Sequence, residues 1–324
     1  MARQTIPDIV ERARPHVGQG VATRPLAVSL FLSLRPSQWT KNLIIFAALL
    51  FSERLLDPGS VGRALAAFAI FCALSGAVYL VNDVLDREAD RTHPLKRHRP
   101  IAAGLVPVPV ALGVAGVLGA GSLLAAVQLR PAFAVIGAVY VGLLALYSGP
   151  LKHIVIIDVL TIAVGFFLRA AAGAVVLGVT ISHWLLIMTI LLALFLALSK
   201  RRHELVLLAD TATTHRRILQ EYSPYLLDQM ISVVTASTLV TYAIYTVSAD
   251  TVEKFGTSLL GLTLPFPLYG IFRYLYLVHQ KEGGGSPSDM LLADRPLLIC
   301  VALWAATVAL IIYGSAAALE RIFQ

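Results

Sequence analysis

Charged residues are scarce in this sequence: Asp, Glu, Lys and Arg make up 14% of its 324 residues, whereas soluble domains carry about 25%. Hydrophobic residues make up 57%, and the mean hydropathy is +0.78. These values exclude a water-soluble globule. Because one crossing takes about 20 apolar residues, they predict a polytopic membrane protein with short connections and no sizeable soluble domain.

Cysteine is also rare, and the two cysteines, Cys72 and Cys300, both lie inside apolar runs. The sequence therefore predicts neither a disulfide framework nor a metal–thiolate centre. An HExxH zinc motif is absent as well. The formal net charge of +7 would suggest nucleic acid for a soluble protein. In a membrane protein, basic residues first serve as topology signals and lipid-surface contacts, so we expect no nucleic-acid partner.

Long apolar stretches, separated by charged or Pro/Gly-rich breaks, account for most of the chain. Before them, residues 1–25 hold four arginines and no long apolar core, which predicts a cytoplasmic tail. Residues 26–324 are expected to form a single all-α transmembrane catalytic domain. Nine transmembrane helices are predicted, at 39–51, 61–81, 106–128, 131–147, 154–178, 182–199, 226–248, 258–278 and 296–315.

The distribution of lysine and arginine predicts the orientation in the membrane. With the N-terminus inside, the cytoplasmic segments hold 17 of these residues and the opposite side holds 5. The two longest connections, 83–106 and 200–225, are the richest in polar residues, and both fall on the cytoplasmic side. We therefore predict a multi-pass protein of the cell membrane, inner or plasma, with its active site at the cytoplasmic face.

A cluster of carboxylates follows the second predicted span. If the helix continues, Asp83, Asp86 and Asp90 lie on one stripe with Asn82, because they are spaced three, four and seven residues apart. Like charges on one stripe repel, and Mg²⁺ suits such oxygens because it also binds substrate phosphates. The cluster therefore predicts a Mg²⁺–diphosphate site. The alternative is a solvated helix end whose acids pair with nearby arginines.

A basic loop from Arg91 to Pro100 comes directly after the carboxylates, and its prolines prevent the helix from continuing. Arginine and lysine beside a carboxylate-bound metal are what an anionic, doubly phosphorylated substrate requires. Further along, Asp158 and Arg169 share a face of the fifth predicted span. Eleven residues place them about 16 Å apart, so they cannot pair directly. We expect a structural role for Asp158 and a functional role for Arg169.

The segment Asn82–Asp90 resembles the first aspartate motif, NDxxDxxxD, of the UbiA superfamily of membrane prenyltransferases. The resemblance implies a nine-helix bundle with a cytoplasmic cap over a central cavity. Three further blocks, Arg35–Asn42, His93–Pro100 and Tyr147–Lys152, are similar to the decaprenyl-phosphate phosphoribosyltransferase branch. That branch implies transfer of 5-phosphoribose from phosphoribosyl diphosphate (PRPP) to a polyprenyl phosphate, with release of diphosphate, for cell-wall arabinan precursors.

One segment departs from the superfamily pattern. Where users of prenyl diphosphates carry a second acidic motif, DxxxD, this chain reads Lys200-Arg201-Arg202-His203-Glu204. Basic residues there suit a site that holds further phosphates directly, as when donor and acceptor are both phosphorylated. Two rivals stay open: an aromatic prenyltransferase that uses a prenyl diphosphate, and a lipid transporter. The charges crowd one interface, whereas transporters place ionisable groups near the midplane.

The residue chemistry and the resemblance together assign roles to individual side chains. Asp83 and Asp86 are expected to be catalytic, with Mg²⁺ as the cofactor. The expected partners are PRPP, a polyprenyl phosphate and the membrane, and the small residues on helix faces permit a homo-oligomer without demanding one. Predicted metal ligands are Asn82, Asp83, Asp86 and Asp90; predicted PRPP contacts are Lys41, Tyr79, Asn82, Arg91, His93, Lys96 and Arg99; predicted contacts to the lipid phosphate are Tyr147, Lys152, Arg169, Lys200, Arg201 and Arg202.

Overall fold

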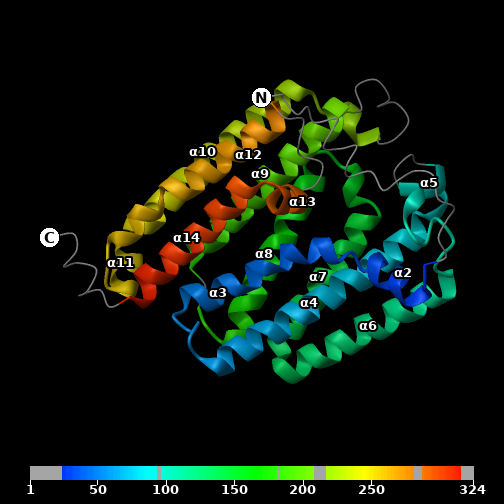
Figure 1. Cartoon of the computed structure of the whole chain (residues 1–324), viewed down its shortest axis with the longest axis horizontal. Coiled ribbons are helices and arrows are strands. Elements are labelled where there is room, and N and C mark those ends of the chain that lie inside the picture. The colour runs from blue at the N-terminus through cyan, green and yellow to red at the C-terminus, as the bar shows by residue number, and fades with distance from the viewer. Residues whose placement is uncertain (1–23, 93–95, 181, 208–216, 281–286, 315–324) are drawn as a thin grey trace, which may run out of the picture.

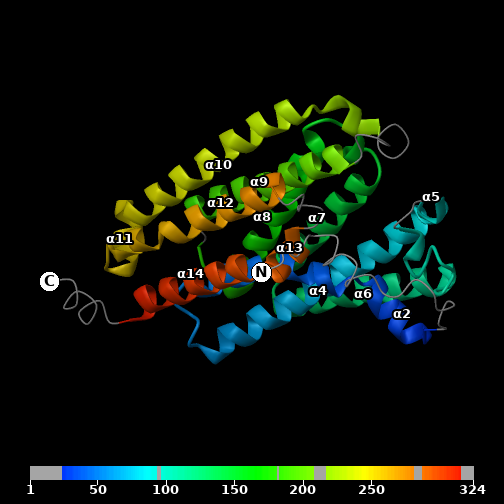
Figure 2. The same cartoon turned by 45° about the horizontal axis from the view of Figure 1, so that its top comes forward.

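The computed structural model describes the chain from residue 24 to 314 except for 93–95, 181, 208–216 and 281–286. Within that part every regular element is helical and no strand occurs, so the predicted all-α class is confirmed. The helices form an elongated bundle with α5 (Arg87–Thr92) at one end and α11 (Ala249–Phe255) at the other (Figure 1; Figure 2). All but two residues of the predicted N-terminal tail lie outside the described residues.

Seven of the described helices are long and apolar enough to cross a membrane. An eighth crossing results if α11 is counted with the 3₁₀ helix η5 (Leu259–Thr263) and α12 (Pro265–Gln280), a pair of segments bent by 102°. The long helices match the predicted spans to within a few residues at most ends. They are α4 (Pro58–Leu85), α6 (Val108–Leu129), α7 (Pro131–Ser148), α8 (Ile157–Leu177), α9 (His183–Leu207), α10 (Pro224–Val247) and α14 (Arg295–Tyr313).

The first predicted span, 39–51, is not one long helix. It consists of the end of a 3₁₀ helix, η1 (Pro36–Ile44), followed by the seven-residue helix α3 (Ile45–Phe51). Before η1, α2 (Leu26–Ser33) ends and Arg35 turns the chain with a left-handed backbone at φ 54°. Each of these pieces is too short to cross a membrane as a single helix, so this segment is not among the seven long helices. The total of nine spans therefore stays a prediction.

Several long helices begin with the same local signal, a capping side chain followed by proline in the first turn. Asp57 accepts hydrogen bonds from Gly59 N–H at 3.2 Å and Ser60 N–H at 3.0 Å at the start of α4. Ser223 and Asp294 cap α10 and α14 in the same way. A side-chain oxygen replaces an acceptor that the first turn lacks, and proline fits there because its missing N–H is not needed.

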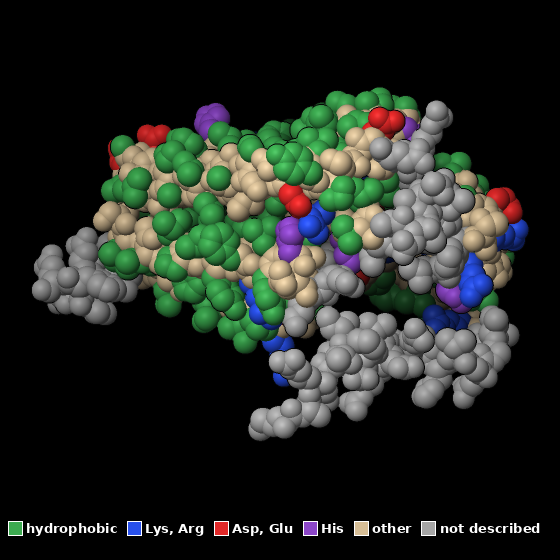
Figure 3. Space-filling model, turned by 90° about the horizontal axis from the view of Figure 1, so that it is seen from above, with side chains coloured by type: hydrophobic (Ala, Val, Ile, Leu, Met, Phe, Trp, Pro, Cys, Tyr) green, Lys and Arg blue, Asp and Glu red, His purple; other side chains and the backbone are tan. Residues whose placement is uncertain are grey.

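Hydrophobic side chains are spread along the body of the bundle in the face seen in Figure 3, and several charged side chains gather at its right-hand end. Val117, Val233 and Leu310 are examples of large apolar side chains that are exposed within this chain. Long helices with exposed apolar sides are typical of proteins in lipid, which solvates these side chains. The chain is therefore a multi-pass membrane protein.

Close packing inside the bundle depends on a glycine where α8 meets α3. A Cβ atom at Gly173 would lie 2.2 Å from the backbone oxygen of Ile45, a distance that no side chain can accept. Gly116 on α6, in contrast, has open space where its Cβ would be. Gly173 therefore sets the distance between α8 and the segment that follows η1.

Replacing Gly173 by alanine is expected to push α3 away from α8 and to lower the free energy of unfolding by about 1–3 kcal/mol. The matched control, Gly116→Ala, is expected to be neutral or slightly stabilising, because alanine is the better helix former. Thermal unfolding of the two variants in the same detergent measures the difference. Equal melting temperatures would contradict the predicted close contact.

Candidate active site

The predicted metal-binding carboxylates lie where α4 ends and α5 begins. Although α4 terminates before Asp86, the backbone hydrogen bonds continue: Asp86 N–H donates to Asn82 O at 2.9 Å, and Asp90 N–H donates to Asp86 O at 2.8 Å. The helical path therefore persists through the break. Asp83 and Asp90 consequently lie on one side, where both contact the same arginine, Arg99.

Cations of the protein neutralise these two carboxylates, each of which is only 2% exposed. Arg99 Nη1 lies 3.2 Å from Asp83 Oδ1 and 2.6 Å from Asp90 Oδ2, so one guanidinium bridges both. Arg35 forms a second ion pair with Asp83, and Lys96 Nζ lies 3.8 Å from Asp90 Oδ1. Pairing of the acids with arginine is thus present in this structure, but the carboxylates of Asp83 and Asp90 are buried and not solvated.

Asp86 is the more accessible member of the motif. Its side chain is 41% exposed, and its Oδ1 lies 3.8 Å from Nζ of Lys152, which the 3₁₀ helix η3 (Leu151–His153) carries. Among the described residues, no three His, Cys, Asp or Glu side chains gather as a ready-made metal cluster. Mg²⁺ does not need one, because it usually binds one or two carboxylates, substrate phosphates and water. The hard oxygen donors of Asn82, Asp83 and Asp86 fit such an ion.

Further cations lie beside the carboxylates on the segment that enters α3. The guanidinium of Arg35 stacks over the ring of Tyr79, with Cζ 4.6 Å from the ring centroid. The positive charges of Arg169 and Arg35 repel the ammonium group of Lys41, and the carboxylate of Asp289 attracts it. The neighbouring charges at Lys41 are therefore mainly positive, which favours the binding of an anion.

Arg169 lies deep in the bundle and is held by neutral groups. Its Nε donates to Asn42 Oδ1 at 2.7 Å, its Nη2 to Tyr140 Oη at 2.5 Å and its Nη1 to Gly165 O at 3.0 Å. Tyr140 in turn lies 3.1 Å from Ser75 Oγ. No carboxylate pairs with Arg169 among the described residues. A buried guanidinium without an acid is costly in an apolar interior and is typical of a functional group.

Arg201 occupies a second buried network, at the same end of the bundle as the carboxylates. Its guanidinium donates to Asp158 at 2.7 Å, to Glu204 at 2.6 Å and to the Tyr147 hydroxyl at 3.1 Å. Tyr222 donates to the other oxygen of Asp158 at 2.9 Å. Burial raises the pKa of Tyr222 to about 12, so its hydroxyl keeps this proton at neutral pH. The network ties α7, α8 and α9 together.

The strained start of α8 depends on that network. Ile156 has a positive φ of 69°, which is unusual for a β-branched residue, and its N–H donates to the Tyr222 hydroxyl at 2.7 Å. The hydroxyl that holds Ile156 is the one that donates to Asp158. Asp158 is therefore part of the structural support of the site, through Arg201 and not through Arg169.

The remaining predicted phosphate contacts have protein partners of several kinds. Arg202 forms an ion pair with Asp228 at 2.5 Å, and Asp228 also lies 3.3 Å from the His279 ring, which joins α9, α10 and α12. Lys200 Nζ lies 3.7 Å from Glu204. Arg91, which is predicted to contact PRPP, pairs at the surface with Glu88 at 3.1 Å. His93 lies outside the described residues.

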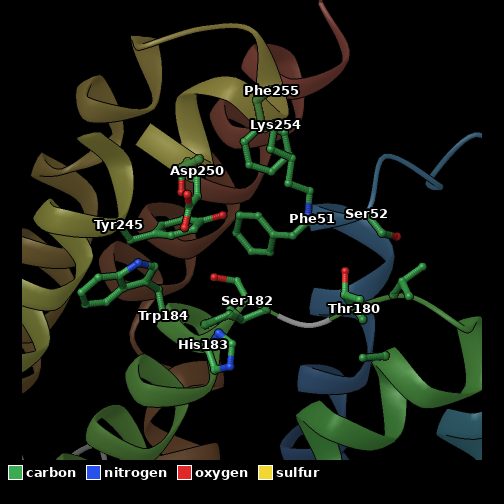
Figure 4. Close-up of a pocket in the computed structure, with 15 residues that line it drawn as sticks. Phe51, Ser52, Thr180, Ser182, His183, Trp184, Tyr245, Asp250, Lys254 and Phe255 are labelled. Carbon is green, nitrogen blue, oxygen red and sulfur yellow. The ribbon is translucent and has the colours of Figure 1, made fainter. Parts of the chain in front are cut away.

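A cavity of about 220 Å³ lies at the other end of the bundle, remote from the predicted site. Figure 4 shows Phe51, Trp184 and Tyr245 around it, with Lys254 of α11 reaching in. Figure 1 places α5, which carries Asp90, and α11, which contributes to the cavity, at opposite ends of the bundle. None of the predicted catalytic or binding residues lines this cavity.

Comparison with known proteins identifies the family. The family model described as UbiA prenyltransferase family matches residues 42–293, which include the carboxylates, Arg169 and the Arg201 network. The chain belongs to the UbiA prenyltransferase family. Decaprenyl-phosphate phosphoribosyltransferase of Mycolicibacterium smegmatis is 34% identical over 94% of this chain and 98% of its own length. The enzyme of that name from Corynebacterium glutamicum is 33% identical, covering 89% and 88%.

A solved UbiA homolog from Archaeoglobus fulgidus, bound to GPP and Mg²⁺, has the same fold. It is 19% identical with a TM-score of 0.66, covering 88% of this chain and 99% of its own. The UbiA fold expected from the aspartate motif is therefore confirmed, whereas the nine helices and the cytoplasmic cap stay predictions. Membership of the UbiA prenyltransferase family also agrees with an enzyme and disfavours the transporter alternative.

Several residues that shape the site were not singled out from the sequence. Arg35, which pairs with Asp83, is absent from the predicted site residues, and the sequence does not connect Asn42 or Tyr140 with Arg169. A signal existed for Arg35 and Asn42, since both stand in the block Arg35–Asn42 that resembles the phosphoribosyltransferase branch. For Tyr140 the only signal was a polar hydroxyl inside an apolar run.

Replacing Asp158 by asparagine is expected to lower the free energy of unfolding by about 3 kcal/mol, because it leaves the buried Arg201 with less compensating charge. The control, Asp250→Asn on α11, removes an exposed carboxylate that forms no ion pair with a described residue, and little change is expected. Denaturant unfolding in detergent compares the two. A similar loss for both would contradict the structural role of Asp158.

Proposed function

We propose that this member of the UbiA prenyltransferase family transfers 5-phosphoribose from PRPP to a polyprenyl phosphate such as decaprenyl phosphate, releasing diphosphate. The observation that carries the proposal is the similarity along nearly the whole chain to enzymes named for that reaction. The abundance of cations near the carboxylates supports it, because PRPP and the lipid together bring three phosphate-bearing regions to one site.

The proposed setting follows from the same features. Residues 26–324 act as one catalytic domain in the cell membrane, and the carboxylates face the cytoplasm, as the distribution of lysine and arginine predicts. A water-soluble donor can then reach the site from the cytosol while the acceptor stays in the bilayer. The product would serve cell-wall arabinan synthesis.

The donor is proposed to bind at the end of α4. Asn82, Asp83, Asp86 and Asp90 would hold Mg²⁺, which when bound acts as a Lewis acid that stabilises the departing diphosphate. Burial of Asp83 and Asp90 keeps their carboxylates at a defined depth. The basic loop places Lys96 and Arg99 next to these carboxylates. We propose that these two side chains bind phosphate oxygens of PRPP together with Arg91, His93, Lys41 and Tyr79.

The acceptor phosphate is proposed to lie between Lys152 and Arg169. Lys152 already touches Asp86, and Arg169 supplies an interior cation that no described acid neutralises. The apolar bundle can hold the polyprenyl chain, since each buried methylene contributes about 0.8 kcal/mol. The phosphate monoester has a second pKa of about 6, so its oxygen is anionic at neutral pH and can attack the anomeric carbon without a general base.

The other basic residues at this end are proposed to hold the helices around the acceptor site together. Arg201 and Arg202 have carboxylate partners on neighbouring helices, and Tyr147 is bound to Arg201. Any contact of these groups with the lipid phosphate would therefore go through rearranged ion pairs. Lys200, at the edge of the same network, is the member with the longest ion-pair distance, 3.7 Å.

Purified protein given labelled PRPP and decaprenyl phosphate is expected to produce labelled lipid and diphosphate. The same preparation given a prenyl diphosphate with 4-hydroxybenzoate is expected to produce no prenylated aromatic product, because the second acidic motif is replaced by Lys200-Arg201-Arg202-His203-Glu204. Thin-layer chromatography of the lipid extract separates the products. Product from the second pair alone would transfer the assignment to an aromatic prenyltransferase.

Asp86→Asn is expected to lower kcat by at least about 100-fold, because preorganised charge at a metal site is worth several kcal/mol in the transition state. EDTA is expected to abolish turnover, and Mg²⁺ to restore it. Glu88→Gln, which removes an exposed acid one residue beyond α5's start, serves as the matched control and should retain most activity. Full activity of Asp86→Asn, or turnover in excess EDTA, would refute the metal-dependent mechanism.

A further inference from the structure

Arg35 is held against Asp83 in an unfavourable backbone conformation. Its φ of 54° and ψ of 65° lie in the left-handed region, which disfavours residues other than glycine. Such a conformation persists only where other interactions compensate for it. Here the compensating interactions are the ion pair with Asp83 and the stacking of the guanidinium on Tyr79.

The ion pair uses the carboxylate that the proposed metal site needs. Asp83 Oδ1 accepts hydrogen bonds from both Arg35 and Arg99, and Arg99 also binds Asp90. A divalent ion on the same carboxylate would place a third cation beside two guanidiniums. Like charges at such distances repel strongly inside a protein, so at least one guanidinium must turn away when the metal binds.

Arg35 can make that movement. Its side chain is 27% exposed, as is that of Arg99, whereas the Asp83 side chain is only 3% exposed. Arg99 has a second carboxylate, Asp90, that holds it in place. Arg35 has Asp83 as its one carboxylate partner among the described residues, and an arginine fork matches phosphate oxygens as well as carboxylate oxygens.

We propose that Arg35 is an exchangeable counter-ion: it neutralises Asp83 in the unliganded protein, is displaced by the divalent cation, and then binds a phosphate group of the donor. This inference rests on the proposed metal site at Asp83. It adds Arg35 to the donor-binding residues and gives Tyr79 the role of a platform that keeps the guanidinium next to both partners. The exchange also keeps the buried carboxylate neutralised when no substrate is bound.

The test compares the full-length wild type with Arg35→Gln in detergent, using Mn²⁺ as a spectroscopic probe without PRPP. Because the variant removes a competitor of the metal, we expect Mn²⁺ to bind about fivefold more tightly by electron paramagnetic resonance, the factor for one partly exposed ion pair. In contrast, KM for PRPP is expected to rise about tenfold, since a charge-assisted phosphate contact is lost. A residue that only shaped the site would weaken both.

Two further variants make the test specific. Arg97→Gln removes one positive charge from an exposed position of the basic loop Arg91–Pro100 and should leave Mn²⁺ binding and KM unchanged. The Arg97 guanidinium contacts His98, and it pairs with no carboxylate in the described part of the chain. Arg35→Lys keeps the charge but not the fork, so Mn²⁺ binding should match the wild type while KM for PRPP stays raised. If Arg35→Gln does not fold, this variant still tests the phosphate contact, because an unchanged KM in Arg35→Lys would overturn the binding of Arg35 to the donor.

The possible failures are distinguishable. Mn²⁺ binding that is unchanged or weaker in Arg35→Gln, with normal binding to the wild type, would overturn the exchange but leave the proposed metal site intact. A wild type that binds no Mn²⁺ would overturn both the exchange and the metal site. Tighter Mn²⁺ binding together with an unchanged KM for PRPP would overturn the proposed contact between Arg35 and a phosphate group of PRPP.

Discussion

Neutralising charge in an apolar bundle is the constraint on which the rest of this structure depends. An ion taken out of water into such an interior loses several kcal/mol of solvation, so it persists only beside an opposite charge or a complete set of hydrogen bonds. Asp83 and Asp158, both buried, each have a guanidinium partner that comes from a different part of the chain. These pairs join the helices at the end of the bundle where the carboxylates lie.

Arg169 is held by hydrogen bonds alone, without an opposite charge from any described residue, and this difference points to function. Its hydrogen bonds go to the neutral oxygens of Asn42, Tyr140 and Gly165, so the interior keeps a net positive charge. Arg35 and Lys41 lie on the neighbouring segment and add to it. An anion that enters this region therefore gains electrostatic attraction, whereas the bundle's apolar surroundings favour a hydrocarbon chain. A phosphorylated lipid satisfies both conditions, and a soluble anion satisfies only the first.

The organisation of the site could be predicted in part. The spacing of Asn82, Asp83, Asp86 and Asp90 predicted a shared stripe, and the hydrogen bonds through the end of α4 preserve it for Asp83 and Asp90. The partners of the basic segment from Lys200 to Glu204 could not be predicted in the same way. Arg201 and Arg202 looked available for phosphates because their own sequence neighbours are mostly basic, and their carboxylates come from other helices.

The sequence by itself determined the class of the protein, the course of most of its membrane helices and the place of its aspartate motif. Apolar run length, capping residues and helical spacing all act within about twenty residues of the chain. The tertiary structure alone decided which charge neutralises which. Arg35 lies 48 residues from Asp83, Arg201 lies 43 from Asp158 and Asn42 lies 127 from Arg169. Only helix packing brings such distant side chains within hydrogen-bonding range.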